Sequence, residues 1–297
     1  MRKNGALLSM ASPGIVVLLI FSYLPISGII IAFKNFRANQ GIWGSAWVGL
    51  DNFRFLFSTS DAWRITLNTL ALNTTFIITT VAGALAVALL LNEVQTSVRA
   101  RFYQSALFFP YFLSWVVIGY IVFAFLSTDG GFVNTILSQF GVAPISWYSE
   151  PNAWVLIITI VNLWKNVGFW SIVYLAGILA ISPELYETAR IDGASKWQQT
   201  IFVTIPLLTP LIVINVLLSI GRIFYADFGL FFNVTRDSSL LYPTMDVIDT
   251  YVYRALRALG DVGMASAAGL YQSVVGFVLV LIANRIVKRY DPEKALF

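Results

Sequence analysis

The stretch that decides the fold is SPELYETARIDGASKWQQTIFVTIP, residues 182–206, a polar segment between two long apolar runs. Ser182 is a candidate N-cap, and Pro183 stands at the first helical position, where proline fits well. Two acidic residues lie in the first turns, where the helix dipole favours negative charge. Gly193 is expected to end the helix or force a turn. The stretch therefore predicts a short helix, a turn and a second helix, a shape that suits docking into a groove on a partner.

On both sides of this stretch the chain consists mainly of apolar runs. Hydrophobic residues make up 58% and charged residues 11% of its 297 residues, whereas a soluble domain typically carries about 25% charged residues. A helix needs ~20 mostly apolar residues to cross a membrane. We therefore predict an all-α integral membrane protein, a single transmembrane domain over residues 1–297, with the polar segment as an inner loop over about 181–205. The six predicted spans are residues 12–33, 65–91, 104–126, 154–180, 206–224 and 264–287.

The residue types that are missing limit the chemistry. The chain contains no histidine and no cysteine, so it has no serine–histidine triad, imidazole proton relay, histidine metal site, disulfide or thiolate nucleophile. It has no G-x-x-x-x-G-K-[ST] run and so cannot bind ATP through a Walker loop of its own. We expect no catalytic residues, metal or cofactor in this chain. If ATP drives the protein, another chain binds it.

The positions of the basic residues predict the orientation, because cytoplasmic loops carry an excess of Lys and Arg. With both termini in the cytoplasm, ten basic residues lie inside and seven outside, and the run at 285–289 directly after the last span favours this choice. We interpret the net charge of +4 as basic loops that face anionic lipid rather than nucleic acid. The inner residues are Arg2, Lys3, Arg99, Arg101, Arg190, Lys196, Arg285, Lys288, Arg289 and Lys294; the outer ones are Lys34, Arg37, Arg54, Arg64, Arg236, Arg254 and Arg257.

The inner loop resembles the EAA loop of ABC importer permeases. That pattern is E-A-A, three residues, G, nine residues, I, one residue, L-P. Here Glu187 begins the triplet, Gly193 follows at the right distance, and VTIP comes nine residues later. The spacing matches fully, with conservative departures at Thr188, Val203 and Ile205.

Other segments narrow the resemblance. ARIDGAS at 189–195 looks like the carbohydrate-uptake branch of the family. FSYLP at 21–25, WVGLDNF at 47–53 and FPYFLSWVV at 109–117 look like permeases for complex oligosaccharides, including alginate-type uronides, more than like maltose permeases.

The resemblance implies the permease subunit of an ATP-driven importer in the bacterial cytoplasmic membrane. Such a subunit forms half of the pathway for an oligosaccharide, with an acidic, alginate-like sugar as the narrower expectation. The implied partners are a second permease, a dimer of ATP-binding subunits that hold ATP and Mg, and an extracytoplasmic binding protein. In the family the EAA loop is the coupling helix, and an ordinary amphipathic interface helix is the alternative. The coupling residues would then be Glu187, Thr188, Ala189, Asp192 and Gly193.

Lys165 is the most informative residue within a span. It lies 11 residues past Trp154, ~16 Å along a helix and close to mid-bilayer, where an ionised lysine costs ~2.5–3.5 kcal/mol or more. Three alternatives are open: a water-filled substrate path, a carboxylate on the partner permease, or bonds to backbone carbonyls. Asn162, Lys165, Asn166 and Phe169 would share one helix face. This face suits sugar binding, and a plain polar helix contact is the alternative.

Arg222 is the remaining candidate for the pathway. With Tyr225 and Asp227 it gathers near the outer end of the fifth span, beside Gly221, a plausible helix break. An interfacial cluster is the alternative. A permease for another solute, such as glycerol phosphate, is the alternative for the substrate. Two other classes of function compete with an importer subunit: a membrane enzyme, which would need a catalytic dyad or an acidic pair at membrane depth, and a secondary sugar transporter. The secondary transporter would usually need an ionisable relay within the helices, and the predicted spans contain no Asp or Glu.

Overall fold

The computed structural model of the chain describes residues 5–54, 58, 60–94, 98–291 and 295. Three of the basic residues counted for the orientation, Arg2, Lys3 and Lys294, lie outside the described residues, as does the side chain of Arg99.

The chain divides into two compact units. One consists of residues 1–63 and 251–274, and the other of residues 64–250 and 275–297. The division runs through three long helices, α4 (Ser60–Val94), α13 (Ile248–Leu259) and α14 (Val262–Tyr290). The organisation of the whole chain as one domain stays a prediction.

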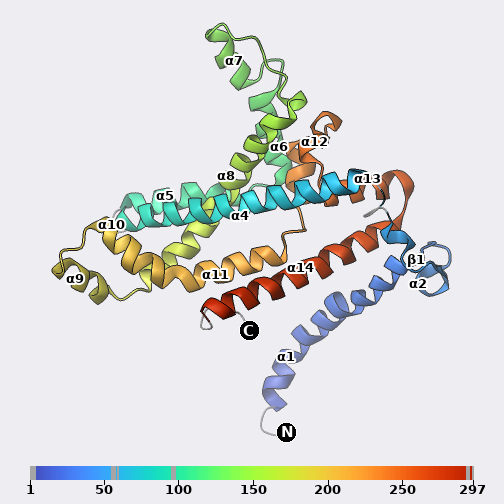
Figure 1. Cartoon of the computed structure of the whole chain (residues 1–297), viewed down its shortest axis with the longest axis horizontal. Coiled ribbons are helices and arrows are strands. Elements are labelled where there is room, and N and C mark those ends of the chain that lie inside the picture. The colour runs from blue at the N-terminus through green and yellow to red at the C-terminus, as the bar shows by residue number, and fades with distance from the viewer. Residues whose placement is uncertain (1–4, 55–57, 59, 95–97, 292–294, 296–297) are drawn as a thin grey trace. The chain divides into compact units, whose positions relative to one another are not determined.

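The smaller unit begins with the first predicted span. Helix α1 (Gly5–Leu18) continues as a π-helical turn, η2 (Leu19–Tyr23), and a 3-10 helix, η3 (Leu24–Phe33) (Figure 1). Pro25 stands in the first turn of η3, where the 3-10 helix itself needs no N–H donor. The backbone therefore stays helical through the whole apolar run, although not as a regular α-helix.

A small hairpin follows the first span. Strand β1 (Lys34–Asn35) pairs antiparallel with β2 (Ala46–Trp47), and α2 (Gly41–Gly44) lies between them. The Lys34 ammonium donates to the carbonyls of Ile42 (2.9 Å) and Trp43 (3.1 Å). The Lys34 side chain thus stabilises a hairpin whose two-residue strands form few backbone hydrogen bonds of their own. The helical turn η4 (Asp51–Phe53) follows it.

The larger unit holds the remaining elements. In chain order they are α5 (Val98–Phe108), η5 (Phe109–Phe112), α6 (Trp115–Leu126), α7 (Phe132–Gln139), η6 (Trp147–Ser149), α8 (Pro151–Leu179), α9 (Pro183–Ile191), α10 (Lys196–Gln199), η7 (Thr200–Thr204), α11 (Ile205–Gly221), η8 (Leu230–Val234), η9 (Ser239–Leu241) and α12 (Tyr242–Met245).

Five helices in the described part of the chain are long and apolar enough to cross a membrane, and a bent pair makes a sixth span if it is counted as one. This confirms the prediction of an all-α membrane protein with about six spans. The observed bounds differ from the predicted ones by a few residues: α8 covers 151–179 against 154–180, and α14 covers 262–290 against 264–287. Helix α11 ends at Gly221 rather than at 224, as the glycine suggested.

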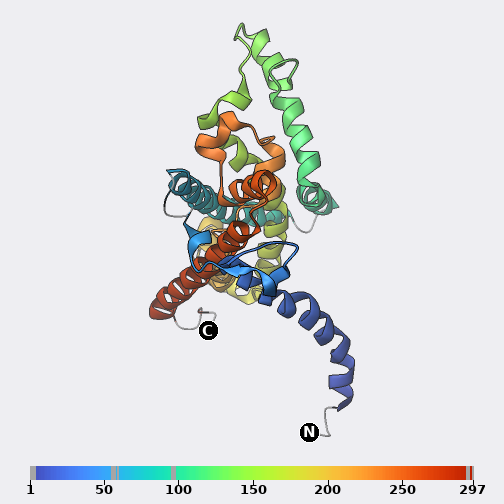
Figure 2. The same cartoon turned by 90° about the vertical axis from the view of Figure 1, so that its right-hand side faces the viewer.

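The third span is not the single continuous helix that was predicted over 104–126. Its halves, Arg101–Phe112 and Trp115–Leu126, meet at 100° (Figure 2). Pro110 stands at the start of η5 and cannot donate a backbone hydrogen bond. Ser114 then caps α6, because its hydroxyl accepts the N–H of Val117 at 3.3 Å. Proline and a capping serine within four residues end one helix and start another.

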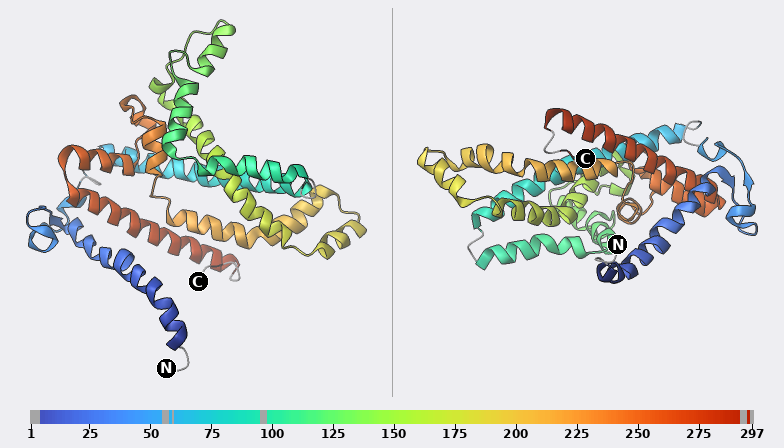
Figure 3. Two further views of the ribbon diagram at one scale, coloured as in Figure 1. Left: turned by 180° about the vertical axis from the view of Figure 1, so that it is seen from behind. Right: turned by 90° about the horizontal axis from the view of Figure 1, so that it is seen from below.

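The hydrophobic core of the larger unit includes a segment that the sequence predicts as a loop. Leu230, Phe231 and Val234 of η8 are fully buried, and they pack with side chains of α4, α6 and α8. A second cluster joins α4, α8 and α11 through residues such as Ala88, Tyr174 and Leu208. The ribbons of the larger unit are seen from behind and from below in Figure 3. The chain between α11 and α13 is therefore a packed part of the fold.

Candidate functional site

The inner loop forms the predicted helix and turn. Helix α9 starts after Ser182 with Pro183 at its first position, although the Ser182 side chain makes no capping bond. Gly193 has φ +80°, a left-handed conformation that glycine adopts at no steric cost. Its N–H donates to the carbonyl of Arg190 (3.0 Å), and the N–H of Ala194 donates to that of Ala189 (2.8 Å). These bonds close the end of α9 where the spacing placed the glycine.

The second helix starts sharply and is tied to α9. Ser195 and Gln198 form a capping box at the start of α10, which runs on through η7 into α11. The hydroxyls of Tyr186 on α9 and Thr204 on η7 lie 2.9 Å apart and share a hydrogen bond. Because Thr204 is buried just before α11, this bond links α9 to the fifth span.

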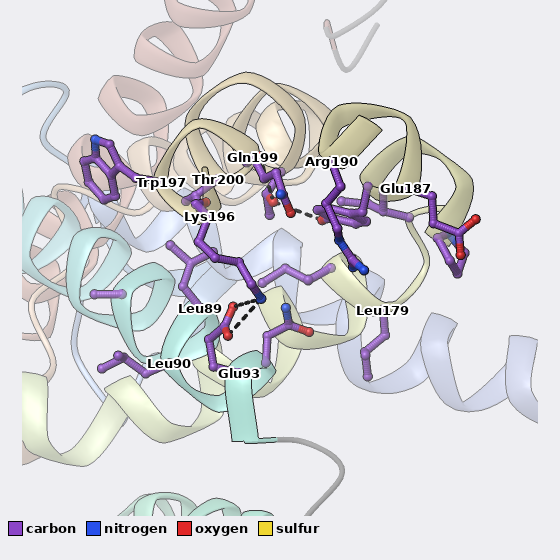
Figure 4. Close-up of a pocket in the computed structure, with 17 residues that line it drawn as sticks. Leu89, Leu90, Glu93, Leu179, Glu187, Arg190, Lys196, Trp197, Gln199 and Thr200 are labelled. Carbon is purple, nitrogen blue, oxygen red and sulfur yellow. Dashed lines mark hydrogen bonds and ion pairs between the residues drawn. The ribbon is translucent and has the colours of Figure 1, made fainter. Parts of the chain in front are cut away.

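A cavity of about 890 Å³ separates α9 and α10 from the ends of α4 and α8 (Figure 4). The Lys196 ammonium lies 3.1 Å from the Glu93 carboxylate of α4 at this cavity. Both side chains are mostly exposed, so the pair contributes at most about 1 kcal/mol. The inner loop is thus joined to the second and fifth spans by few contacts, and it is not packed into them.

Most of the predicted coupling residues on α9 are accessible, and Glu187 also lines the cavity. Glu187, Thr188 and Asp192 are exposed, and Ala189 is half-buried. Ile191 is 86% exposed, an unusual state for an apolar residue in a polar loop. Ile191 was not among the predicted coupling residues. Its position between two charged residues at the end of a helix could have indicated that it is exposed. The predicted coupling residues therefore lie on a surface that a partner can reach.

Lys165 of α8 meets the break in the third span. Its ammonium donates to the carbonyl of Leu113, to that of Tyr111 (2.9 Å) and, more weakly, to that of Pro110 (3.5 Å). The side chain is 9% exposed, and the nitrogen lies 5.0 Å from the Trp115 ring centroid. Of the three alternatives for this lysine, bonds to backbone carbonyls are the one observed. The ammonium supplies the donors that the broken helix lacks, which lipid cannot supply.

Phe169 adds an aromatic surface to the same place. Its ring stacks on Tyr111 with centroids 4.6 Å apart, and Phe108 joins the stack at 6.2 Å. A Cβ on Gly168 would lie 1.9 Å from the carbonyl oxygen of Leu107. The glycine therefore permits direct backbone contact between α8 and α5. Tyr111 and Gly168 were not predicted as site residues, because their partners are distant in sequence.

The two asparagines of the predicted face pair with each other. The Asn166 amide donates to the side-chain oxygen of Asn162 at 3.0 Å and to its carbonyl at 2.9 Å. Asn162 is buried and Asn166 is half-buried. The α8 candidates thus form a polar pair next to the lysine and the aromatic stack.

The predicted cluster of Arg222, Tyr225 and Asp227 does not form a single site, because Asp227 binds a different element from the other two. Arg222 is exposed at the C-cap of α11, and its carbonyl accepts the N–H of Tyr225 at 2.8 Å. Asp227 instead belongs with the break: its carboxylate accepts the indole N–H of Trp115 at 2.7 Å and the N–H of Leu230 at 3.3 Å. Trp115 thus contacts both the Lys165 ammonium and this carboxylate.

Residues 81–292 match the sequence family described as "Binding-protein-dependent transport system inner membrane component". The chain belongs to this family. The match includes the inner loop, the broken third span and the segment 223–246, so the resemblance of the loop to that of ABC importer permeases is confirmed.

Individual relatives match over nearly their whole length. The polygalacturonan/rhamnogalacturonan transport system permease protein YteP of Bacillus subtilis is 33% identical over 287 residues, 96% of this permease and 88% of the relative. A crystal structure of a bacterial ABC transporter involved in the import of the acidic polysaccharide alginate contains a chain with 34% identity and a TM-score of 0.87. The alignment covers 98% of this permease and 97% of that chain. A crystal structure of a bacterial alginate ABC transporter in complex with an alginate pentasaccharide-bound periplasmic protein contains a chain with 33% identity and a TM-score of 0.87. The alignment covers 97% of this permease and 96% of that chain.

The segment 223–246 of this permease is joined to α4 by side-chain hydrogen bonds. The Arg64 guanidinium lies 3.3 Å from the buried Asp246 carboxylate. Asn68 donates to the Asp246 carbonyl at 3.0 Å, and Asn73 donates to that of Ile223 at 2.8 Å. Polar residues spaced along one helix thus hold both ends of the segment 223–246. This segment has a fixed shape, on which a binding surface can be built.

Proposed function

We propose that this permease forms half of the translocation pathway of an ATP-driven importer for an acidic oligosaccharide. The observation that carries the proposal is the full-length match, at 34% identity and a TM-score of 0.87, to a chain of a transporter that imports the acidic polysaccharide alginate. The relative named for polygalacturonan transport, at 33% identity, supports the same substrate class, because polygalacturonan is also a chain of uronic acids.

The proposed partners are a second permease, two ATP-binding subunits that hold ATP and Mg, and a binding protein that delivers the sugar. The chain has no Walker loop of its own, and one alginate transporter is known with its periplasmic protein. In this proposal α9 docks on the ATPase through Glu187, Thr188, Ala189 and Asp192, with Gly193 forming the turn. The Tyr186–Thr204 bond would transmit movement of α9 to the fifth span.

The proposed pathway surface centres on the α8 face: Asn162, Lys165, Asn166 and Phe169. The stacked rings of Tyr111 and Phe169 offer flat apolar faces to sugar rings, while the asparagine amides suit hydroxyl groups. Lys165 acts here by fixing the break that presents Tyr111, since its donors are engaged by carbonyls. Arg222, exposed after α11, is proposed as a further charged contact.

Reconstituted transport tests the function. Proteoliposomes with both permeases, the ATPase and the binding protein are expected to import trigalacturonate only when ATP is supplied. A hydrolysis-dead ATPase should abolish uptake, because in this proposal the permease couples transport to hydrolysis through α9. Uptake that continues with the dead ATPase would instead indicate a secondary transporter.

We also propose that both termini are cytoplasmic and that the segment 222–250 is outside. The chain lacks cysteine, so single introduced cysteines report without background. Ser239→Cys, at an exposed position, is expected to react with an impermeant thiol reagent in intact cells. Ser182→Cys, exposed before α9, should react only after permeabilisation. The reverse pattern would overturn the orientation.

A further inference from the structure

Two residues with side chains hold a left-handed backbone conformation, Arg236 (φ +58°) and Asp237 (φ +47°). All the other described residues with positive φ are glycines. Aspartate tolerates this region better than most residues, whereas for arginine it is sterically unfavourable. Glycine would form the same turn without strain, and strain of this kind clusters at functional sites. An arginine at this position is therefore expected to have a functional role.

The surroundings impose the shape of this turn. The Ser238 hydroxyl donates to the carbonyl of Tyr148 at 3.2 Å, and the Tyr242 hydroxyl donates to the Asp237 carboxylate at 3.3 Å. The Tyr148 hydroxyl donates to the carbonyl of Val234 at 3.3 Å. Because these contacts hold the backbone on both sides, the Arg236 side chain leaves the turn at a fixed place.

The Arg236 guanidinium lies over an aromatic ring. Its central carbon is 4.1 Å from the ring centroid of Phe123, and Phe123 packs edge-on against Tyr148 at 5.8 Å. Burial raises the pKa of the Tyr148 phenol to about 12, against the opposing effect of Arg236, so the phenol stays neutral. In the described part of the chain, the exposed guanidinium stacks on a ring and forms no ion pair.

A pocket of about 260 Å³ lies beside this arginine. Tyr120 and Phe232 give it aromatic walls, and Asn233 and Asp237 give it polar groups. Its volume is just below the ~300–1,000 Å³ of pockets for drug-sized ligands, so it suits one sugar ring rather than a whole oligosaccharide.

The floor of the pocket is rigid. A Cβ on Gly119 would lie 2.7 Å from the carbonyl oxygen of Asn233, so the backbones of α6 and η8 touch there. A pocket built on two touching backbones keeps its shape when a ligand enters.

We propose that this pocket is a subsite for one uronate residue of the transported sugar, whose carboxylate pairs with Arg236. The planar guanidinium can bind a carboxylate through two parallel N–H donors, while Tyr120 and Phe232 pack against the sugar ring. The Asp237 carboxylate, which also lines the pocket, can accept hydrogen bonds from the sugar hydroxyls. This proposal rests on the proposed function and names the contact that selects an acidic sugar.

The test compares an acidic probe with its neutral ester in the assembled importer. Proteoliposomes with the full complex are offered trigalacturonate or fully methyl-esterified trigalacturonate. Arg236→Gln is expected to lower uptake of the acid about tenfold or more, as the loss of a charged hydrogen bond predicts, and to leave uptake of the ester within about twofold of the unmodified importer. Arg54→Gln, a control at an exposed arginine outside the pocket, should change neither.

A second variant separates loss of charge from misfolding. Arg236→Gly removes the guanidinium and also relieves the backbone strain, so the complex should melt at the same temperature as the unmodified one, or higher. It should show the same selective loss of acid uptake.

Each other outcome overturns the proposal in a distinguishable way. If the unmodified importer takes up only the ester or neither probe, the proposed function fails together with this subsite. If Arg236→Gln takes up the acid normally, the subsite alone is wrong. If the acid and the ester fall equally, Arg236 acts through the fold or through contact with the binding protein.

Discussion

Lys165→Met is expected to destabilise the permease and to reduce import of acidic and neutral oligosaccharides alike. The lysine donates to three carbonyls at the break of the third span. Three carbonyls left without donors cost roughly 1–3 kcal/mol each, while removal of the buried charge relieves roughly 2.5–3.5 kcal/mol. The net loss is then about 3 kcal/mol, a large share of the 5–15 kcal/mol that stabilises a typical protein.

Melting of the assembled complex in detergent, together with uptake of both sugars, checks this result. Lys288→Met removes an exposed lysine from the last turn of α14 and should change stability by no more than about 0.5 kcal/mol. A Lys165→Met complex that melts normally and loses only the acidic sugar would contradict the assignment. It would show that the ammonium binds the substrate carboxylate directly.

For Lys165, the sequence predicts the depth of the residue in the membrane but not the groups that it binds. Its depth in an apolar run follows from the rise of a helix, and the cost of a charge there predicts that something must satisfy it. The partner cannot be read in the same way, because the carbonyls that accept its bonds lie 52 to 55 residues earlier in the chain. Tertiary packing alone brings the break in the third span to α8.

The break in the third span could not be predicted from hydropathy, because both halves of the span are apolar. Proline is tolerated within membrane spans when neighbouring groups satisfy the freed carbonyls, so Pro110 alone does not predict a bend of 100°. The combination of Pro110 with Ser114, a good N-cap four residues later, is the local signal that was available. By contrast, the helix and turn of the inner loop were predictable, since a proline at the first helical position, a helix-ending glycine and their spacing are all local features. The predicted capping bond of Ser182 is not made, and the capping box of Ser195 and Gln198 was not predicted.

The burial of η8 could not be predicted from the sequence either. An apolar run that interrupts a polar region and is too short to cross a membrane is ordinarily interpreted as a loop with scattered hydrophobic residues. Leu230, Phe231 and Val234 are buried because α4, α6 and α8 surround them, and such an arrangement follows from topology rather than from pattern. The positive φ of Arg236 has the same origin, as the packed segment forces the turn that follows it.

Gly193→Leu is expected to abolish the ATP hydrolysis that the loaded binding protein stimulates, while the chain still inserts in the membrane. The glycine has φ +80°, so a leucine there adds roughly 1–2 kcal/mol of backbone strain. Apart from the glycine and its two chain neighbours, no described residue has an atom within 4 Å of a Cβ built at this position. The fold therefore has space for the side chain, whereas an ATPase docked against the loop would meet both the bulk and the altered turn.

Two further variants isolate the cause. Gly193→Ala imposes the strain with little bulk and should retain part of the stimulated hydrolysis. Gly141→Leu is matched in geometry, with φ +75° and open space around its Cβ, but it lies between α7 and α8, away from the inner loop. It should assemble and hydrolyse ATP normally, because its strain is the same and its position touches no coupling contact. Full stimulation in Gly193→Leu, or equal losses in Gly193→Leu and Gly141→Leu, would remove α9 from the coupling step and leave its exposed residues as an ordinary membrane-surface helix.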